Sequence, residues 1–225
     1  MGDVSAAAII GVGPGLGSAL ARRFAAAGFD LLLLNRSMQP MNAVVAALSG
    51  SSTRVDIRQV DVTDQAALVD AMTAGTTRIG PIAVLIFNAV GFTPEPPSRV
   101  SVEALRRDLD IAVLGAVTAV QTALPSLTET VRSGAAATIL ITGGGIALYP
   151  SAHGGTLPIT KAAQRALALA LAHELAPVGI HVATVTVNGT IGTDAGFTPD
   201  RIAETFWTVH AQLADQWQTE IVFNG

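Results

Sequence analysis

Short apolar runs alternate with longer segments of helical periodicity along the whole chain. Seven runs predict strands, at Ala6–Gly11, Asp30–Asn35, Asp56–Asp61, Ile82–Asn88, Thr138–Thr142, His181–Val187 and Thr219–Phe223. Six segments between them predict helices, at Leu16–Gly28, Met41–Leu48, Asp64–Gly75, Ser101–Thr130, Thr156–Ala176 and Thr198–Gln212. Alternating strands and helices form parallel sheets with right-handed crossovers. The pattern therefore predicts an α/β fold, a doubly wound parallel sheet of about seven strands with helices on both faces.

The polarity of the strands indicates their order in this sheet. The runs LLLL at 31–34 and AVLIF at 83–87 are apolar on both sides, as central parallel strands are. The third strand, DIRQVDV, is more polar and is expected at an edge. No repeat, charge block or long linker divides the 225 residues, so we expect a single domain over residues 1–225.

Composition narrows the range of partners. Half of the residues are hydrophobic, 13% are charged and the formal net charge is −4, without a basic cluster. Nucleic acid and anionic membrane surfaces are therefore not expected partners. The absence of cysteine excludes disulfides, cysteine-ligated zinc, iron–sulfur clusters and thiol catalysis. No metal site is expected.

Two uncharged stretches, Val4–Ala21 and Ile111–Thr128, approach the length of a membrane span. Glycine and proline interrupt the first, and the second contains Thr, Gln, Ser and Pro125. We interpret both as buried segments of a soluble protein. An acidic residue stands near the N-terminus, where a signal peptide would be basic. A cytoplasmic location is the expectation.

A glycine-rich turn follows the first strand and opens the first helix. Glycines let the backbone approach a pyrophosphate, which binds the N–H groups of a helix N-terminus. The spacing G-x-G-x-x-G does not fit, because Leu16 or Ser18 stands where its third glycine is required. The spacing G-x-x-x-G-x-G fits Gly11, Gly15 and Gly17. In this strand–turn–helix context the motif predicts a Rossmann-type domain that binds a dinucleotide, with Leu16 inside the turn.

The end of the second strand indicates which dinucleotide binds. NAD-specific domains place an acid there to bind the ribose 2′-hydroxyl. This chain has Asn35, Arg36 and Ser37 instead. An amide beside a guanidinium accepts a 2′-phosphate, which a carboxylate would repel. NADP is therefore expected, and NAD is the less favoured alternative.

Further segments resemble the short-chain dehydrogenase/reductase family over essentially the whole chain. Asp61-Val62 resembles its adenine-contacting acid, and Asn88-Ala89-Val90-Gly91 its Asn-Ala-Gly segment. Thr160-Lys161-Ala162-Ala163 resembles the end of its Tyr-x-x-x-Lys helix. Asn188-Gly189-x-Ile191-x-Thr193 resembles its Pro-Gly-x-x-x-Thr turn over the nicotinamide, with Asn replacing Pro. The resemblance implies that these segments bind the cofactor and that Lys161 binds the nicotinamide ribose.

The resemblance also implies a catalytic Tyr, Ser and Asn, and this sequence departs from all three. The Tyr position, four residues before Lys161, is Leu157. The Ser position is Gly144 or another glycine of the TGGG run, and the Asn position is Ala112. A bacterial subgroup with similar glycine and C-terminal segments often lacks the tyrosine. Four residues remain as alternatives for a substitute proton donor: Tyr149, His153, Thr142 and Thr156.

Three functions stay open at this point. The first is an NADP-dependent oxidoreductase of a small-molecule substrate, with a non-standard or solvent proton donor. The second is a catalytically silent dinucleotide-binding protein, and the third a lyase or isomerase on the same fold.

The apolar stretches IAVLGAVTAVQTAL and ALALALA are too apolar all round to cover a sheet with one stripe. A homodimer or homotetramer is therefore expected. The segment after Thr193 is short, which predicts an open substrate pocket.

Overall fold

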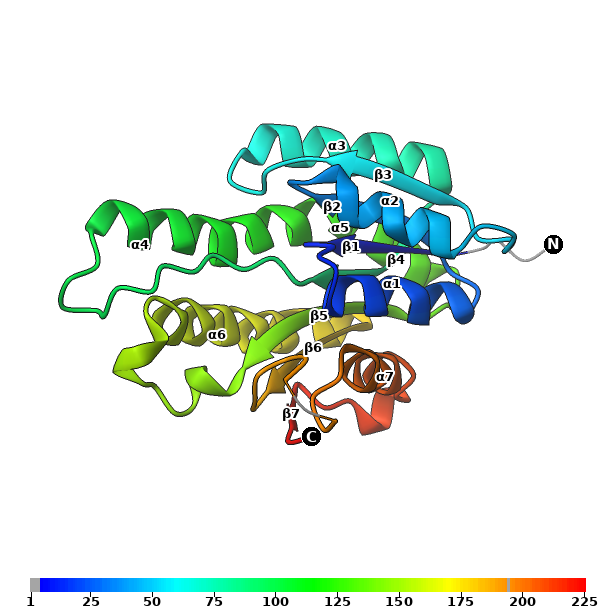
Figure 1. The fold of residues 1–225 in the computed structure, drawn as a ribbon. Coiled ribbons are helices and arrows are strands. Elements are labelled where there is room, and N and C mark those ends of the chain that lie inside the picture. Colours follow the sequence, from blue (N-terminus) through cyan, green and yellow to red (C-terminus); the bar gives the residue numbers. More distant parts are fainter. Residues whose placement is uncertain (1–4, 194) are drawn as a thin grey trace.

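The computed structural model describes residues 5–193 and 195–225, and their strands form one seven-stranded sheet in the order β3-β2-β1-β4-β5-β6-β7 (Figure 1). All strand pairs are parallel. The strands are β1 (Ala6–Ile10), β2 (Asp30–Asn35), β3 (Val55–Gln59), β4 (Ile82–Phe87), β5 (Ala137–Gly144), β6 (Ile180–Val187) and β7 (Glu220–Phe223). The doubly wound sheet is confirmed, and so is the edge position of the third strand. The N-terminal residues used to argue against a signal peptide, Met1–Val4, lie outside the described residues.

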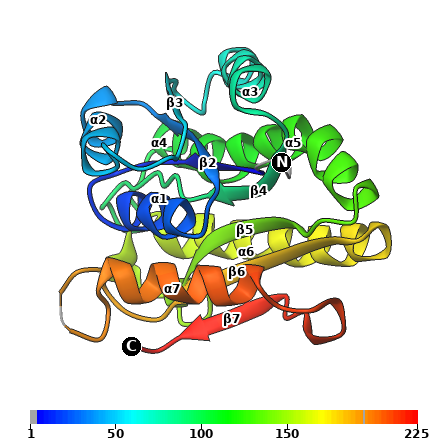
Figure 2. The ribbon, with the colours of Figure 1, turned by 90° about the vertical axis from the view of Figure 1, so that its right-hand side faces the viewer.

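Helices cover both faces of the sheet, which makes three layers (Figure 2). One face packs against α1 (Leu16–Ala26), α2 (Met38–Ala47) and α7 (Pro199–His210). The other packs against α3 (Gln65–Ile79), α5 (Gly115–Arg132) and α6 (Leu157–Leu175). Alternate residues of β1 enter opposite cores: Ala8 and Ile10 one, Ala7 and Ile9 the other. This alternation follows from the two-residue period of a strand.

Two helix boundaries differ from the prediction by more than two residues. Helix α2 begins at Met38, before Pro40, because proline fits the first turn of a helix, where its missing N–H costs no bond. Helix α3 runs past Gly75 to Ile79. Gly75 is a packing residue, since a Cβ there would lie 2.3 Å from Leu32 Cδ1. The helix ends instead at Ile79, before Gly80, whose φ is +103°.

The helix expected at Ser101–Thr130 is divided. Helix α4 (Val102–Leu109) is followed by a π-helical turn at Asp110–Leu114 and then by α5. Over Val102–Arg132 the helical segment is long and apolar enough to span a membrane by length and composition, and 39% of its most apolar window is buried within the chain. The rest of this window is partly or fully exposed in the single chain.

The topology places a crevice at the carboxyl ends of the strands. Strand order reverses between β1 and β4, because the chain first builds outwards to β3 and then continues from β4 to β7. At such a switch point the connecting loops diverge and leave room for a ligand.

Candidate functional site

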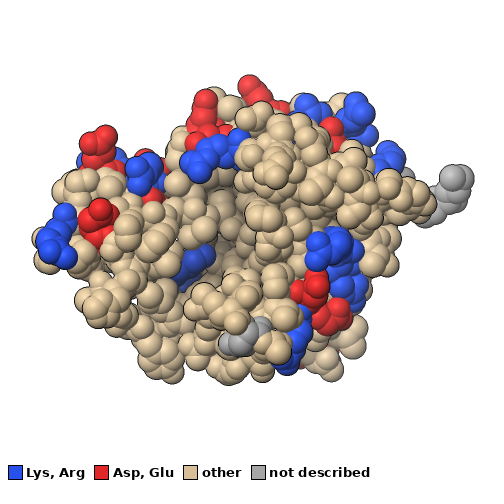
Figure 3. All heavy atoms as spheres, in the orientation of Figure 1, with Lys and Arg blue, Asp and Glu red and all other residues tan. Residues whose placement is uncertain are grey.

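Two adjoining pockets lie at this switch point and share Asn88 and Val90. The smaller, of about 290 Å³, is lined by the ends of β1, β2, β3 and β4. The larger, of about 720 Å³, is lined by the ends of β4, β5 and β6, by the start of α6 and by the loops between them. A hollow is visible on this side of the molecule, and the surface around it is mostly uncharged (Figure 3). Most of the residues predicted to bind the cofactor line one of these two pockets.

The three motif glycines have different structural roles. Gly11 has φ of +88°, and a Cβ there would lie 2.6 Å from the backbone nitrogen of Ala89. A Cβ on Gly17 would lie 2.7 Å from the Gly11 carbonyl oxygen, so this glycine lets α1 pack closely on the turn that follows β1. A Cβ on Gly15 would meet nothing within 4 Å. The first and third glycines thus serve the packing, whereas Gly15 leaves open space at the N-terminus of α1.

This open N-terminus fits a diphosphate. No side chain caps α1, and the first turn holds no acidic residue. The Ser18 N–H donates to the Gly13 carbonyl at 3.0 Å, so the turn offers an anion the N–H groups of Leu16 and Gly17 and the positive end of the helix dipole. The geometry agrees with the role predicted for the glycine turn, and Leu16 lines the larger pocket beside it.

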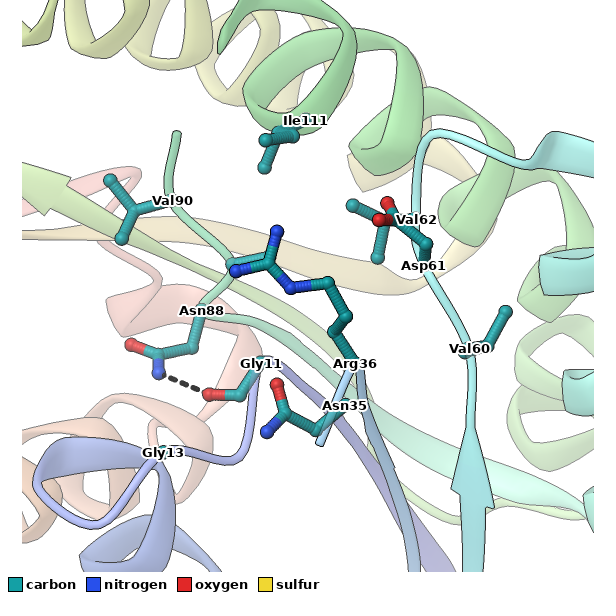
Figure 4. Close-up of a pocket in the computed structure, with 11 residues that line it drawn as sticks. Gly11, Gly13, Asn35, Arg36, Val60, Asp61, Val62, Asn88, Val90 and Ile111 are labelled. Carbon is teal, nitrogen blue, oxygen red and sulfur yellow. Dashed lines mark hydrogen bonds between the residues drawn. The ribbon is translucent and has the colours of Figure 1, made fainter. Parts of the chain in front are cut away.

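Arg36 extends across the smaller pocket, between Asp61 and Val90 (Figure 4). Asn35 also lines this pocket, and its Nδ2 donates to the carbonyl of Ser37, the N-cap of α2. The pKa of Asp61 lies below its usual value, mainly because the Thr63 N–H donates to the carboxylate, with smaller contributions from the Thr63 hydroxyl and the Arg36 charge. The pocket thus offers one cation near the end of β2 and one carboxylate after β3.

A chain of hydrogen bonds links the end of β1 to the end of β5. Asn88 Nδ2 donates to the Gly11 carbonyl at 2.8 Å (Figure 4), and Thr142 Oγ1 donates to Asn88 Oδ1 at 2.9 Å. Lys161 Nζ donates to the Thr142 carbonyl at 2.7 Å and to Gln164 Oε1 at 2.8 Å. Lys161 lines the larger pocket, and burial lowers its pKa to about 8. The amine is held by two neutral acceptors rather than by a carboxylate.

Gln164 is a site residue that sequence reasoning missed. Its Oε1 accepts from Lys161, and its Nε2 donates at 3.1 Å to the Ala112 carbonyl in the π-helical turn. The side chain is 1% exposed. A polar residue three positions after Lys161 was the only available signal, and helical spacing places it on the same side of α6. Gln164 therefore connects Lys161 to the bend between α4 and α5.

The four alternatives for a proton donor lie in different environments. Thr142 lines the larger pocket, as does Tyr149, which is 71% exposed. His153 is exposed and does not line the pocket. Thr156 is fully buried outside the pocket lining, where its hydroxyl donates to Asp108 Oδ2 at 2.7 Å. The structure therefore brings Thr142 and Tyr149 to the pocket and leaves His153 and Thr156 away from it.

The segment after β6 forms the remaining wall. Asn188, Gly189, Thr190 and Ile191 line the larger pocket. Thr193 lies beside it, and its hydroxyl donates to the Thr190 carbonyl at 2.7 Å. The Gly192 N–H donates to the Phe197 carbonyl at 2.8 Å, which closes this segment on itself. The predicted turn thus lies beside the pocket.

The comparisons with known proteins agree with this geometry. A family model described as short chain dehydrogenase matches residues 5–198, so the chain belongs to the short-chain dehydrogenase family. Relatives of this family act on small molecules, as their names state. The sulfoacetaldehyde reductase of Chromohalobacter salexigens is 28% identical over 224 residues, covering 96% of this chain and 79% of that protein. The meso-2,3-butanediol dehydrogenase of Serratia marcescens is 30% identical over 164 residues, covering 71% and 64%.

Solved structures show the same fold. A short-chain dehydrogenase from Rhodopseudomonas palustris has a TM-score of 0.86 at 22% identity and covers 98% of both chains. A metagenomic short-chain oxidoreductase in complex with NADP has a TM-score of 0.85 at 18% identity and covers 97% of this chain and 95% of that one. Both likenesses bear on the fold alone.

The single lysine of the chain makes the role of Gln164 measurable. Replacing the neutral acceptor by a carboxylate in Gln164→Glu should raise the pKa of Lys161 by about one unit or more, because an adjacent negative charge favours the ammonium. Gln164→Met removes the acceptor at similar volume and should lower this pKa below about 8. Nitrogen NMR of lysine-labelled protein across a pH titration gives one signal to follow.

The solvent-exposed Gln121→Glu on α5 is the control and should leave the pKa unchanged. A Lys161 pKa that is insensitive to both Gln164 substitutions would contradict the contact.

Proposed function

We propose that the chain is an oxidoreductase that binds NADP(H) in this crevice and transfers a hydride to or from a small-molecule substrate. The observation that carries the proposal combines two features. The N-terminus of α1 is open at Gly15, and the smaller pocket has Arg36, rather than an acid, where the 2′-group of the adenosine ribose would lie. NADP(H) would supply the hydride. The diphosphate would lie on α1, the adenosine in the smaller pocket, and the nicotinamide end in the larger pocket.

The residues of the chain would bind and orient the cofactor. Arg36 would bind the 2′-phosphate, and Asp61 with Val62 would contact the adenine. Lys161 would donate its remaining N–H to the nicotinamide ribose. Asn88, Ala89, Gly189, Ile191 and Thr193 would surround the nicotinamide end. Two of the residues at the usual catalytic positions, Gly144 and Leu157, line the larger pocket without a polar side-chain atom. We infer that the proton comes from solvent or from Thr142 or Tyr149.

Cofactor preference tests this proposal. NADPH should bind more tightly than NADH, and Arg36→Ala should weaken NADPH binding by about 1–3 kcal/mol while hardly changing NADH binding, because only NADPH has a 2′-phosphate. A fluorescence titration of both nucleotides measures this. Arg78→Ala, an exposed arginine that does not line the crevice, is the matched control. Equal affinities for the two nucleotides would contradict the NADP assignment, and no binding of either would refute the proposal.

A catalytically silent binding protein is the second candidate. The observation in its favour is the apolar lining at positions 144 and 157, which offers no proton donor next to Lys161. Such a protein would keep the affinity for NADP(H) and lack turnover. The substitutions that separate the two candidates are described in the Discussion.

We further propose that the chain forms a homodimer or homotetramer through α5 and α6. Leu114 and Ile159 are 44% and 37% exposed, and Ala162, Ala166 and Ala170 form an exposed row on α6. Such apolar helix surface is typical of a subunit interface. Sedimentation at micromolar concentration should show the oligomer, and Ala166→Arg should dissociate it.

Ala43→Arg, at an exposed alanine of α2 on the opposite face of the sheet, should leave the assembly intact. A wild-type monomer would contradict the expectation.

A further inference from the structure

The larger pocket is lined mainly by apolar side chains and glycine backbone, with seven polar residues among its seventeen lining residues. Its apolar residues come from five segments of the chain and comprise Leu16, Val90, Ile146, Leu157, Val187 and Ile191. Gly143, Gly144 and Gly145 add backbone without side chains. The volume of about 720 Å³ lies within the range of pockets that take drug-sized molecules. Under the proposed function the nicotinamide end takes part of this volume, and the remainder, together with the open rim, is left to the substrate.

Of the seven polar residues that line this pocket, Asn88, Thr142, Lys161 and Asn188 bind other parts of the protein through their side chains. The other three, Tyr149, Ser151 and Thr190, are exposed and belong to the open side of the pocket. Asn88 donates to Gly11 and accepts from Thr142, so neither side chain is free to turn into the pocket without loss of these bonds. Asn188 Nδ2 donates to Asn224 at 3.0 Å. The bonds of Asn88 and Thr142 are partly buried, whereas that of Asn188 is exposed. Because a buried polar group that loses its partner costs about 1–3 kcal/mol, the bonds of Asn88 and Thr142 are expected to persist when a substrate enters.

Lys161 is the one charged residue among the described residues that line the larger pocket. It donates to Thr142 and Gln164, and under the proposed function its remaining N–H binds the cofactor. No arginine among the described lining residues is available to pair with a carboxylate, sulfonate or phosphate. Desolvating such a group without a partner is costly. An anionic substrate is therefore disfavoured.

The rim of the pocket carries apolar surface as well. Val90 is 53% exposed, Tyr149 71% and Ile191 37%, and all three line the pocket. Each apolar Å² that a ligand removes from water contributes about 25 cal/mol, so these side chains favour a ligand whose apolar part reaches the rim. The interior and the rim of the pocket thus both favour an apolar ligand.

We propose that this pocket takes an uncharged, hydrophobic carbonyl compound, or the corresponding alcohol, that carries a ring system or a long alkyl chain. The proposal rests on the proposed function for its chemistry. In the reduction, the carbonyl carbon accepts a hydride supplied by NADPH and the oxygen accepts a proton, so the ketone becomes an alcohol as NADPH becomes NADP⁺. The apolar part of the substrate packs against Leu157, Ile146 and the rim.

A matched pair of ligands tests the substrate class by binding alone. 2-Decanone and 9-oxodecanoate have the same chain and the same carbonyl position, and differ by a terminal carboxylate. Isothermal titration of the protein, with and without NADP⁺, should show 2-decanone binding at least about tenfold more tightly, a difference of about 1.4 kcal/mol. Equal affinities, tighter binding of the carboxylate, or no binding of either ligand would overturn the proposal.

Two arginine substitutions test whether the preference for the uncharged ligand arises in this pocket. Ile191→Arg places a cation at the rim and should reduce the preference for 2-decanone at least about tenfold, because the carboxylate then has a partner. Val178→Arg replaces another exposed apolar residue, before the start of β6 and so at the opposite end of the sheet, and should leave the preference unchanged. If Ile191→Arg also leaves the preference unchanged, the ligand does not bind in this pocket and the proposal fails.

Failure of this proposal is distinguishable from failure of the proposed function. An NADPH titration reports on the cofactor crevice without any substrate. Binding of NADPH with no preference between the two ligands would refute the substrate class and leave the oxidoreductase proposal standing. Preference for the ketone without NADPH binding would refute the oxidoreductase proposal and leave the preference for an uncharged, hydrophobic ligand standing.

Discussion

Leu157→Tyr combined with Gly144→Ser should raise the rate of NADPH oxidation by ketones and aldehydes at least about a thousandfold over the wild-type chain. A positioned general acid contributes about 10²–10⁴-fold, and a hydrogen bond to the developing alkoxide about 10²–10³-fold more. The lower ends of both ranges, with partial overlap, give the stated factor. The measurement is a spectrophotometric assay of NADPH against a panel of ketones, aldehydes and quinones.

The structure provides room for both side chains. Leu157 begins α6 one helical turn before Lys161, and both residues line the larger pocket. Gly144 has φ of −147°, and a Cβ there would lie 3.6 Å from Lys161 Cγ, an ordinary contact. At Gly143 a Cβ would lie 2.6 Å from Thr184 Oγ1, and at Gly145 2.2 Å from Asn188 Oδ1. Gly144 is therefore the position of the TGGG run that accepts serine.

The pair Leu157→Phe with Gly144→Ala is the matched control, since it adds similar bulk without hydroxyl groups and should gain no activity. An inactive wild type whose activity is restored by the hydroxyls would favour the silent binding protein. Brisk turnover by the wild type would contradict the expected slow rate. Tyr149→Phe, Thr142→Val, His153→Ala and Thr156→Val would then identify the donor.

Gly11→Ala should lower the free energy of unfolding by about 2–5 kcal/mol, whereas Gly15→Ala should change it little and weaken NADPH binding. At Gly11 the φ of +88° costs a residue with a Cβ about 1–2 kcal/mol, and the 2.6 Å approach to Ala89 adds about 1–3 kcal/mol of overpacking. At Gly15 a methyl group meets no protein atom but enters the space proposed for the diphosphate. Urea unfolding measures the first effect and nucleotide titration the second.

Gly50→Ala separates the two contributions at Gly11, since Gly50 has φ of +89° but a Cβ there would meet nothing within 4 Å. Gly50→Ala should lower the free energy of unfolding only by the conformational contribution of about 1–2 kcal/mol. If Gly15→Ala destabilised the fold as much as Gly11→Ala, the separate roles assigned to the two glycines would be wrong. If it left NADPH affinity unchanged, the diphosphate would not lie at Gly15.

The sequence alone determined the strands, their parallel pairing and the edge position of β3. Each central strand is a continuous apolar run because both of its faces are covered, and this pattern is local. The glycine turn was equally readable, since its spacing, the preceding strand and the following helix lie within about twenty residues. The helix boundaries were less certain, because Pro40 and Gly75 act through their surroundings: Pro40 lies in the first turn of α2, and Gly75 packs against Leu32.

Only the tertiary structure decided how the candidate site is connected. Gln164 reaches the Ala112 carbonyl across 52 positions of sequence, and Thr156 is bound to Asp108 across 48. Nothing in the neighbourhood of these residues signals such partners, because the contacts exist only after α4, α5 and α6 have packed side by side. For the same reason the residue types did not show which polar groups of the pocket are already bonded. Asn88, Thr142 and Lys161 are polar in the sequence, and it is their mutual contacts in the fold that leave the inner part of the pocket mainly apolar.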